Sequence, residues 1–503
     1  MEATKFPSQY VKWVQFCISS TTYTLMINGE SFGYFKGGKG IRQGDPLSPL
    51  LFTQVMEYLT RTLTYYAGIS KFKYHPMCKG LNIISLAFAG DLIVACKADM
   101  DSIKMILSCL EHFKNVTGME VNYNKPRMVL GGVSEEEARE FLRLARMSRG
   151  DLPFKYLGGP ITASRITERD CEALVQKLTS RITVWATKHL SYAGRYKLIN
   201  SVLLGIISFW CRLFIIPNKV MQKIQSLCRN FLWSSKAEYN RVPAVSWEDV
   251  CWPKKEGGLG IKNLVLWNYA CGQSLLWDIA NKKDILWVKW IHNRYLKGTT
   301  IWDIKVKPGM CYYLRKILQN RRMFEDMIIG GNYEIQKGYE LLMGVSTEFQ
   351  AYQIVWNKLT APKHQFLSWL GWRNRISTKV RSNKFMDIDT NCVLCPNGEE
   401  DKNHLFYTCP YTRDIKEEIG QWLQFRWKAN NDEEMKEEIK RIKGRKHRQI
   451  ILAGFAAICY AVWKARNHKI KQQRSISTGE SKEWIKFQLE TYINNKLRNM
   501  VLC

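Results

Sequence analysis

The sequence is short of the features that mark secreted proteins. Its 15 cysteines are too sparse for a disulfide scaffold in a chain of 503 residues, and an odd number cannot all pair within the chain. The first residues, MEATKFPSQYVKWVQF, lack the basic region and the apolar run of a secretory signal. We therefore expect an intracellular protein of the nucleus or cytoplasm, in a reducing compartment, and not a secreted one.

Long uninterrupted apolar runs are also missing. The best candidate for a membrane span, residues 198–217, is broken by four polar side chains, Asn200, Ser201, Ser208 and Arg212. We favour a buried helix or helix pair over a membrane span here, and we expect no membrane partner. Residues 450–465 are apolar too, but this stretch is too short and too interrupted to cross a bilayer. Internal repeats and low-complexity segments are absent as well.

Acidic residues are scarce relative to basic ones. Lys and Arg number 75 against 45 Asp and Glu, which gives a formal net charge of +30. Nucleic acid is the commonest partner of such a chain, although solubility alone and an acidic membrane surface remain open explanations. The hydrophobic fraction of 46% is ordinary for a globular protein, and the length predicts about three domains.

Glycines bracket a short turn at residues 40–49, GIRQGDPLSP, that leads into a helix with one apolar face. Asp45 is expected to cap this helix and Pro46 to occupy its first position. Apolar side chains then recur at every fourth position, at Leu47, Leu51, Val55, Leu59 and Leu63. The turn would present Arg42 and Gln43, which suit phosphates and base or sugar edges. The alternative is an ordinary capped helix with a solvated arginine.

Two β-hairpins are predicted in the same region. Residues 23–27 and 33–35 flank the turn-forming pair Asn28-Gly29, and residues 83–88 and 92–96 flank Ala89-Gly90-Asp91. A carboxylate at a hairpin tip can hold a metal, although Asp91 can equally be a plain turn residue. A helix at 101–116 follows and is expected to end at Gly118.

Near the other end of the chain, four residues have the spacing C-x2-C, x8, H-x4-C. They are Cys392, Cys395, His404 and Cys409. Three thiolates and one imidazole form a tetrahedral set that favours zinc and leaves no open position for catalysis, which indicates a structural site. The alternative is four unrelated residues.

The order of these parts resembles the reverse transcriptase of LINE-type (non-LTR) retroelements, particularly of the plant branch. The likeness rests on the Asn28-Gly29 hairpin and on GIRQGDPLSP, FAGD at 88–91, GMEVNYNK at 118–125 and LPFKYLG at 152–158. It continues through WEDVCWPKKEGGLG at 247–260 and through WNKLTAPK at 356–363, which precedes the zinc-type spacing that plant elements share. The combination is far more specific than any single motif.

The resemblance implies an α+β fold and a chain truncated at its N-terminus relative to the family. The expected parts are a partial polymerase palm with an antiparallel sheet and helices (1–160), a thumb-like helical region (161–235), a helical connection (236–340), a zinc-binding region (341–425) and a basic helical tail (426–503). Thumb helices are expected at 167–186 and 198–233.

The resemblance also shows what this sequence lacks. The family holds two Mg²⁺ ions with one Asp from an early palm strand and a pair from the FADD hairpin. Here no Asp precedes Asp45, and Gly90 replaces one hairpin Asp, so Asp91 is the only palm carboxylate retained. We therefore predict an RNA-directed DNA polymerase region that is catalytically dead, a pseudoenzyme of a transposable element that does not retain Mg²⁺. Completion of the site by another chain is a weaker alternative.

Other roles follow from the resemblance alone. Arg42, Gln43 and Gly44 would lie near the incoming nucleotide and template, and Lys125 near the triphosphate, unless these residues merely survive from an ancestor. Zn²⁺ is the expected structural cofactor, and an RNA template and a DNA or RNA/DNA duplex are the expected partners. Thumb cations would grip the duplex, namely Lys177, Arg181, Lys188, Arg195 and Lys197.

Two further alternatives stay open at this point. The basic cluster at 440–448 can be a nuclear-import signal, a nucleic-acid patch or a solvated helix face. The chain as a whole can also be a non-catalytic nucleic-acid-binding zinc protein that reuses the polymerase scaffold, or a purely structural interaction protein.

Overall fold

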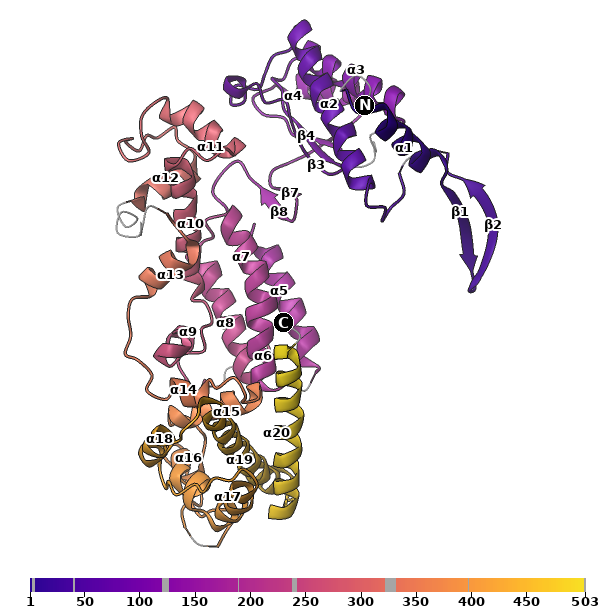
Figure 1. The fold of residues 1–503 in the computed structure, drawn as a ribbon. Coiled ribbons are helices and arrows are strands. Elements are labelled where there is room, and N and C mark those ends of the chain that lie inside the picture. The colour runs from indigo at the N-terminus through magenta and orange to yellow at the C-terminus, as the bar shows by residue number, and fades with distance from the viewer. Residues whose placement is uncertain are drawn as a thin grey trace. The chain divides into compact units, whose positions relative to one another are not determined.

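The computed structural model describes residues 1, 5–38, 41–119, 126–188, 190–237, 242–321, 332–396 and 398–501, with the backbone alone for 497–501. The chain divides into two compact units (Figure 1). Unit 1 consists of Met1–Ala163 and Asp278–Met310, and unit 2 of Ser164–Trp277 and Cys311–Cys503. Each unit has a hydrophobic core of its own. The five regions expected from the sequence are finer than this division and stay a prediction.

Unit 1 mixes helices with short strands, as the α+β class predicts. Its helices include α1 (Ser8–Ser19), α2 (Ser48–Ile69), α3 (Met100–Thr117), α4 (Glu135–Ala145) and α11 (Leu286–Ile291). Its strands are β1 (Thr22–Ile27), β2 (Glu30–Lys36), β3 (Ser85–Phe88), β4 (Asp91–Val94), β5 (Arg127–Met128), β6 (Ser148–Arg149), β7 (Phe154–Tyr156) and β8 (Gly159–Ile161). They pair as β1–β2, β3–β4 and β7–β8, all antiparallel, and as β5–β6, which is parallel. Among the described residues the expected palm sheet is therefore a set of small two-stranded ladders.

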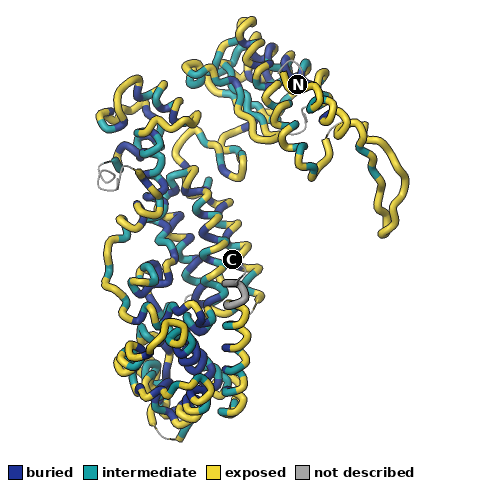
Figure 2. Tube along the Cα trace, in the orientation of Figure 1, coloured by how far each residue is buried: buried dark blue, intermediate teal, exposed yellow. Residues whose placement is uncertain are grey.

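The first hairpin confirms the turn predicted at Asn28-Gly29. Both residues have positive φ, 53° and 89°, and Ile27 pairs directly with Glu30. This backbone twist suits a two-residue hairpin turn, in which Asn and Gly are favoured. The side chains of both strands are almost all exposed (Figure 2).

The core of unit 1 lies between α2 and α3. Leu59, Leu63 and Ala67 of α2 pack with a face of α3 that includes Cys109 and Phe113. The Asp99 carboxylate caps α3 by accepting from the Ser102 backbone N–H, and the helix ends at Gly118 with φ of 70°. The helix predicted at 101–116 is thus confirmed within one residue at each end.

The start of α2 differs from the expectation. The helix begins at Ser48, so Pro49 and not Pro46 lies in its first turn. The Asp45 carboxylate accepts from the Leu47 backbone N–H at 2.8 Å and closes a local turn before the helix. Asp45 therefore shapes the approach to the helix and does not cap it, and burial of the predicted apolar face is complete only from Leu59 onward.

Unit 2 is mainly helical. Its first helices are α5 (Glu172–Ala186), α6 (Tyr192–Leu198), the π-helical turn η3 (Ile199–Leu203), α7 (Leu204–Leu213), α8 (Asn218–Ser234), α9 (Trp247–Cys251) and α10 (Leu264–Ala280). Then follow α12 (Tyr312–Gln319), α13 (Ile335–Met343), α14 (Tyr352–Val355), α15 (Pro362–Trp372), α16 (Lys379–Asn383), the π-helical turn η7 (His404–Thr408), α17 (Pro410–Trp422), α18 (Asp432–Lys440), α19 (Arg445–Gln472) and α20 (Thr478–Val501).

The helix expected over 198–233 is interrupted before Pro217. Phe214 is extended, and α8 begins only at Asn218, because proline cannot donate a helical hydrogen bond and disfavours helix in the residue before it. The buried Asn268 side chain provides hydrogen-bond partners for the backbone at this interruption. It accepts from the Ile216 N–H at 3.3 Å and donates to the Ile216 carbonyl at 2.9 Å. The break is therefore a fixed feature of the core.

One helical stretch among the described residues, Tyr192–Leu213, has the length and composition of a membrane-spanning helix by those two criteria alone. It overlaps the stretch that the sequence singles out. Ile199, Leu203, Ile207 and Trp210 lie in the core of unit 2. Only 33% of the stretch is buried, however, so the expectation of a buried helix pair stays a prediction.

Candidate functional site

The hairpin at FAGD is present, with a tighter turn than expected. Phe88 pairs directly with Asp91, so the turn consists of Ala89 and Gly90 alone. Ala89 has a positive φ of 49°. Asp91 is the first residue of β4 and is exposed, which leaves its carboxylate at the hairpin tip.

Nothing in the fold requires glycine at position 90. A Cβ added to Gly90 would meet no atom within 4 Å, and its φ lies outside the left-handed region that favours glycine. An aspartate at this position would therefore fit without strain or a clash. The glycine that replaces an aspartate of FADD therefore removes a carboxylate from the tip, and the turn does not need it.

The Asp91 carboxylate interacts electrostatically with the Tyr156 hydroxyl of β7. Burial raises the pKa of the Tyr156 hydroxyl, and the negative charge of Asp91 raises it further. Within the described ranges, Asp91 belongs to no group of three or more His, Cys, Asp or Glu side chains with converging ligand atoms. The tip thus offers one exposed carboxylate.

The glycine-bracketed turn presents its side chains as the sequence predicts. The Arg42 carbonyl accepts from the Ser48 hydroxyl at 2.6 Å and from the Asp45 N–H at 3.4 Å, while Gly44 has φ of 89°. Arg42, Gln43 and Gly44 are all exposed on this closed turn. Their roles beside a nucleotide stay a prediction, and Lys125 lies outside the described residues.

The expected thumb cations fall into two groups. Lys177, Arg181, Lys188 and Lys197 are exposed. Arg195 is instead half-buried, and its guanidinium donates to the carbonyls of Leu190 at 3.1 Å and Leu232 at 2.7 Å. It also lies 4.5 Å from the Tyr192 ring centroid, and burial lowers its pKa. Arg195 therefore joins α6 to α8, and the expectation that it grips a duplex is wrong.

The four residues with zinc-type spacing come together in unit 2. One ligand atom from each of Cys392, Cys395, His404 and Cys409 lies within 4.8 Å of all the others. Cys392 and Cys409 are buried, and the Cys395 sulfur lies 3.2 Å from the His404 Nε2. Three sulfurs and one imidazole nitrogen at this spacing fit a tetrahedral zinc ion.

Local structure fixes the cluster from both sides. The Cys392 N–H donates to the Gly398 carbonyl at 2.9 Å, which closes the loop that carries the first two cysteines. The Asp401 carboxylate accepts from the His404 N–H at 2.6 Å where the helical segment that carries His404 starts, and Cys409 follows η7 directly. Gly398 has φ of 116°, and a Cβ there would lie 2.9 Å from the His404 ring, so glycine is required.

Two of the thiols interact with each other. The interaction with Cys409 lowers the pKa of Cys392, and the same interaction raises the pKa of Cys409. Close packing of thiols in this way favours a cation, because the negative charge of the thiolates needs a positive partner.

A buried ion pair that the sequence did not reveal supports the metal loop, the segment between Cys392 and Cys409. Glu400, between the two halves of the cluster, is fully buried and pairs with Arg466 of α19 at 2.7 Å. Its Oε1 also accepts from the Lys379 N–H at 3.0 Å. No sequence signal links residues 66 positions apart, so this partner required the structure.

Comparison with known proteins finds a family match for each of the two regions that carry the candidate sites. Residues 1–161 match the model of the reverse transcriptase (RNA-dependent DNA polymerase) family. Residues 333–415 match the model of the zinc-binding region in reverse transcriptase, which includes all four cluster residues and Glu400. The two matches follow in the order that the motifs predict.

Several curated proteins are similar to parts of the chain. A putative ribonuclease H protein of Arabidopsis thaliana is 32% identical over 28% of this chain and 22% of its own length. The Pol polyprotein of a type-2 retrotransposable element of Drosophila melanogaster is 29% identical over 51% of this chain and 24% of its own, and a transposon TX1 protein of Xenopus laevis is 26% identical over 52% and 19%. The chain thus spans about a quarter or less of the length of these relatives. Both family matches and the relatedness to retrotransposon Pol polyproteins place the chain in the LINE-type (non-LTR) reverse transcriptases, with their C-terminal zinc-binding region.

Proposed function

We propose that this chain is a reverse transcriptase region that binds nucleic acid, holds a structural zinc ion and does not polymerise. The observation that carries the proposal is Gly90, at a hairpin tip where the fold accepts an aspartate and the family pattern has one. Asp91 alone remains at that tip.

Polymerisation needs two divalent cations, one to activate the attacking hydroxyl and one to neutralise the leaving phosphates. Mg²⁺ is held by carboxylates in near-octahedral geometry, and a single exposed carboxylate binds it weakly. The side chains at the tip therefore do not fit a magnesium pair. Without the pair, a bound triphosphate lacks the charge neutralisation that drives its transfer.

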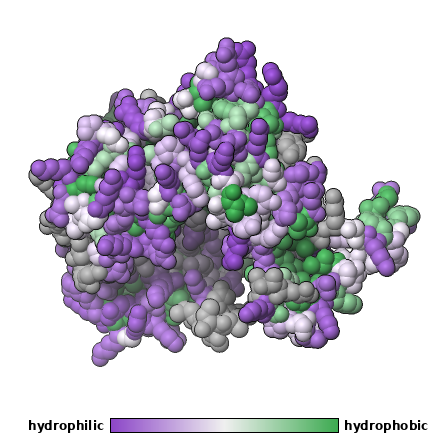
Figure 3. Space-filling model, turned by 90° about the horizontal axis from the view of Figure 1, so that it is seen from above, coloured by the Kyte–Doolittle hydropathy of each residue, from purple (hydrophilic) through white to green (hydrophobic). Residues whose placement is uncertain are grey.

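Nucleic-acid binding is supported by charge and exposure. The chain carries a net charge of +30, and hydrophilic side chains predominate on the face seen in Figure 3. Lys177, Arg181, Lys188 and Lys197 are exposed on or beside α5 and α6, where they can contact phosphates. These charges do not depend on the hairpin, so binding can persist without catalysis.

Zinc is supported by the donor set. Cys392, Cys395, His404 and Cys409 would fill all four positions of a tetrahedral ion, which leaves none for water or substrate. Zinc would supply positive charge to the buried thiolates and cross-link the loop to η7. Its role is then to stabilise unit 2 and not to perform chemistry.

A primer-extension assay on a primed RNA template, with Mg²⁺ or Mn²⁺ and an active reverse transcriptase as positive control, tests the proposal. We expect no extension, together with salt-dependent binding of the same template. Binding without extension also favours the second candidate, a non-catalytic nucleic-acid-binding zinc protein, because that function does not need a carboxylate at position 90. Extension by the chain would overturn the proposal.

The zinc assignment has its own test. Elemental analysis of the purified chain should find one zinc ion per chain. A Cys392→Ser substitution should remove it, whereas Cys17→Ser, at an exposed cysteine of α1, should not. Zinc retained in full by the first variant would contradict the assignment.

A further inference from the structure

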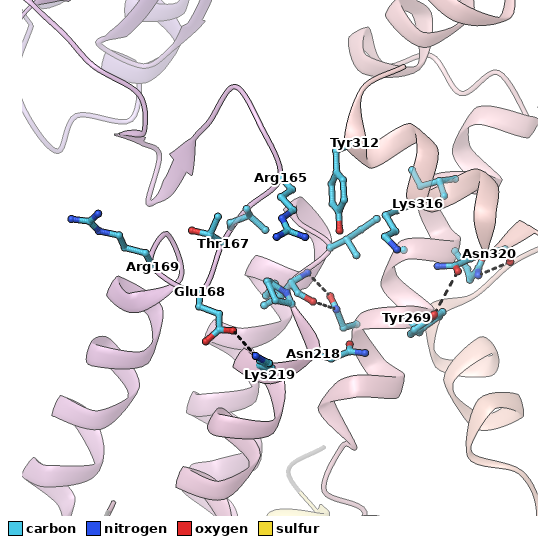
Figure 4. Close-up of a pocket in the computed structure, with 18 residues that line it drawn as sticks. Arg165, Thr167, Glu168, Arg169, Asn218, Lys219, Tyr269, Tyr312, Lys316 and Asn320 are labelled. Carbon is cyan, nitrogen blue, oxygen red and sulfur yellow. Dashed lines mark hydrogen bonds and ion pairs between the residues drawn. The ribbon is translucent and has the colours of Figure 1, made fainter. Parts of the chain in front are cut away.

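A cavity of about 620 Å³ lies in unit 2 at the start of α8, between the segment before α5 and helices α10 and α12 (Figure 4). A second cavity of about 300 Å³ shares Arg165, Tyr312 and Lys316 with it and adds Arg315 and Gln319. The larger volume is in the range of pockets that hold small ligands, and it can accommodate one nucleotide.

The wall of the larger cavity is strongly basic. Among the described residues, its cationic side chains are Arg165, Lys219 and Lys316, with Arg169 at its edge, and Glu168 is its one acidic residue. A Glu168 oxygen lies 3.8 Å from the Lys219 Nζ, so this carboxylate balances Lys219 and leaves the other cations in excess. A ligand with negative charge fits such a wall.

Three side chains converge on the same space. Figure 4 shows Arg165 and Lys316 on either side of the Tyr312 ring, with the polar ends of all three directed into the cavity, while Arg169 points away. All three line both cavities, so they are neighbours in space. Two cations beside an aromatic ring are the combination that holds a phosphate and a stacked base.

The backbone at the cavity adds to this charge. α8 has 17 residues and begins at Asn218 without a side-chain cap, and Asn218 and Lys219 both line the cavity. The positive end of the helix dipole therefore reinforces the cationic side chains.

We propose that this cavity binds one unpaired nucleotide of an RNA strand, with Arg165 and Lys316 on the phosphate and Tyr312 against the base. The assignment rests on the proposed nucleic-acid binding and gives it a specific subsite. An unpaired base can leave its neighbours and stack on an aromatic ring, whereas a base that is paired and stacked within a duplex cannot enter the cavity to reach Tyr312.

Fluorescence anisotropy with the full chain tests the assignment. The probes are a labelled oligouridine of about twelve nucleotides and a duplex of the same length, titrated at several salt concentrations. The variants are Arg165→Gln with Lys316→Gln, and Tyr312→Leu. The matched control is Lys223→Gln with Lys384→Gln, which removes two exposed positive charges away from the cavity.

We expect the cavity double variant to bind oligouridine at least about tenfold more weakly than the control, with a salt slope smaller by about 1.4. Tyr312→Leu should weaken oligouridine binding about fivefold or more, because it removes a stacking surface. Duplex affinity should change no more than in the control. Unfolding midpoints equal to that of the wild type would establish that the variants are folded.

Failure of the subsite and failure of the proposed function give different results. If the wild type binds both probes and the cavity variants match the control, the subsite is wrong and nucleic-acid binding stands. An equal loss on the duplex, or displacement of oligouridine by micromolar uridine triphosphate, would also overturn the assignment to an RNA strand. If the wild type binds neither probe, the proposed function fails, and the subsite with it.

Discussion

The Glu400 Oε1 accepts two hydrogen bonds from the Arg466 guanidinium, from Nε at 3.0 Å and from Nη2 at 2.7 Å. Glu400 is fully buried and Arg466 is 9% exposed. The pair joins the loop between the candidate zinc ligands to the long helix α19. The metal loop is therefore held by an electrostatic contact as well as by its ligands.

Arg466→Met should destabilise unit 2 by about 3 kcal/mol or more, because it leaves the buried Glu400 carboxylate without a positive partner, with only the Lys379 N–H still donating to it. Urea unfolding of the zinc-loaded chain measures this. Lys337→Gln, which breaks the exposed pair with Glu334, is the control and should shift the midpoint little. Equal midpoints for the two variants would mean that the buried pair does not hold the loop.

Gly398→Ala should weaken zinc binding at least about tenfold, since the new Cβ displaces the His404 ring from the cluster. Competition with a chromophoric chelator measures the affinity. Gly344→Ala is the matched control because Gly344 also has a positive φ, 76°, but has open space around its Cα. If both variants keep the wild-type affinity, His404 is not a ligand in the arrangement described.

His364 should make unit 2 sensitive to acid. Burial lowers the pKa of its imidazole to about 3, and its ring packs 4.8 Å from the Tyr460 ring. Below the unfolded value of about 6.5, the unfolded chain gains a proton that the folded chain does not bind, so stability is lost as the pH falls from there toward 3. Between pH 7 and pH 5 the wild type should lose free energy of unfolding through His364. The His364→Phe variant should lose about 2 kcal/mol less over the same pH range. Parallel losses in urea unfolding would show that His364 is already charged in the fold.

Gly90→Asp should place two adjacent carboxylates at the hairpin tip without loss of stability. We expect Mn²⁺ affinity, followed by electron paramagnetic resonance, to rise about tenfold or more, because two carboxylates hold a hard cation better than one. Gly68→Asp is the control, since Gly68 also has open space and lies in the same unit. Equal Mn²⁺ binding by the two variants would show that the tip is not a cation site even when its carboxylate is restored.

Sequence patterns predicted the parts of this chain that depend on local chemistry. Asn28-Gly29 specifies its own turn, Gly118 ends α3, and the spacing of Cys392 to Cys409 brings four ligands together, because each depends on residues close in sequence. Family resemblance supplied the palm and zinc regions in the right order.

Features that depend on distant contacts were not predictable. The break before Pro217 is stabilised by Asn268, 52 positions away, and Arg195 is held by the Leu232 carbonyl, 37 positions away. A charged residue on a helix looks the same in sequence whether it faces solvent or a neighbouring helix. The ion pair of Glu400 and Arg466 is hidden for the same reason.

Primer extension by the wild-type chain, measured alongside its binding to the same primed RNA template, tests the central claim most directly. The predicted result is a salt-dependent complex with no added nucleotides in Mg²⁺ or Mn²⁺, while the active control enzyme extends the primer fully. Nucleotide addition that is abolished by Asp91→Asn would contradict the claim, because it would show a working metal site at a tip with one carboxylate.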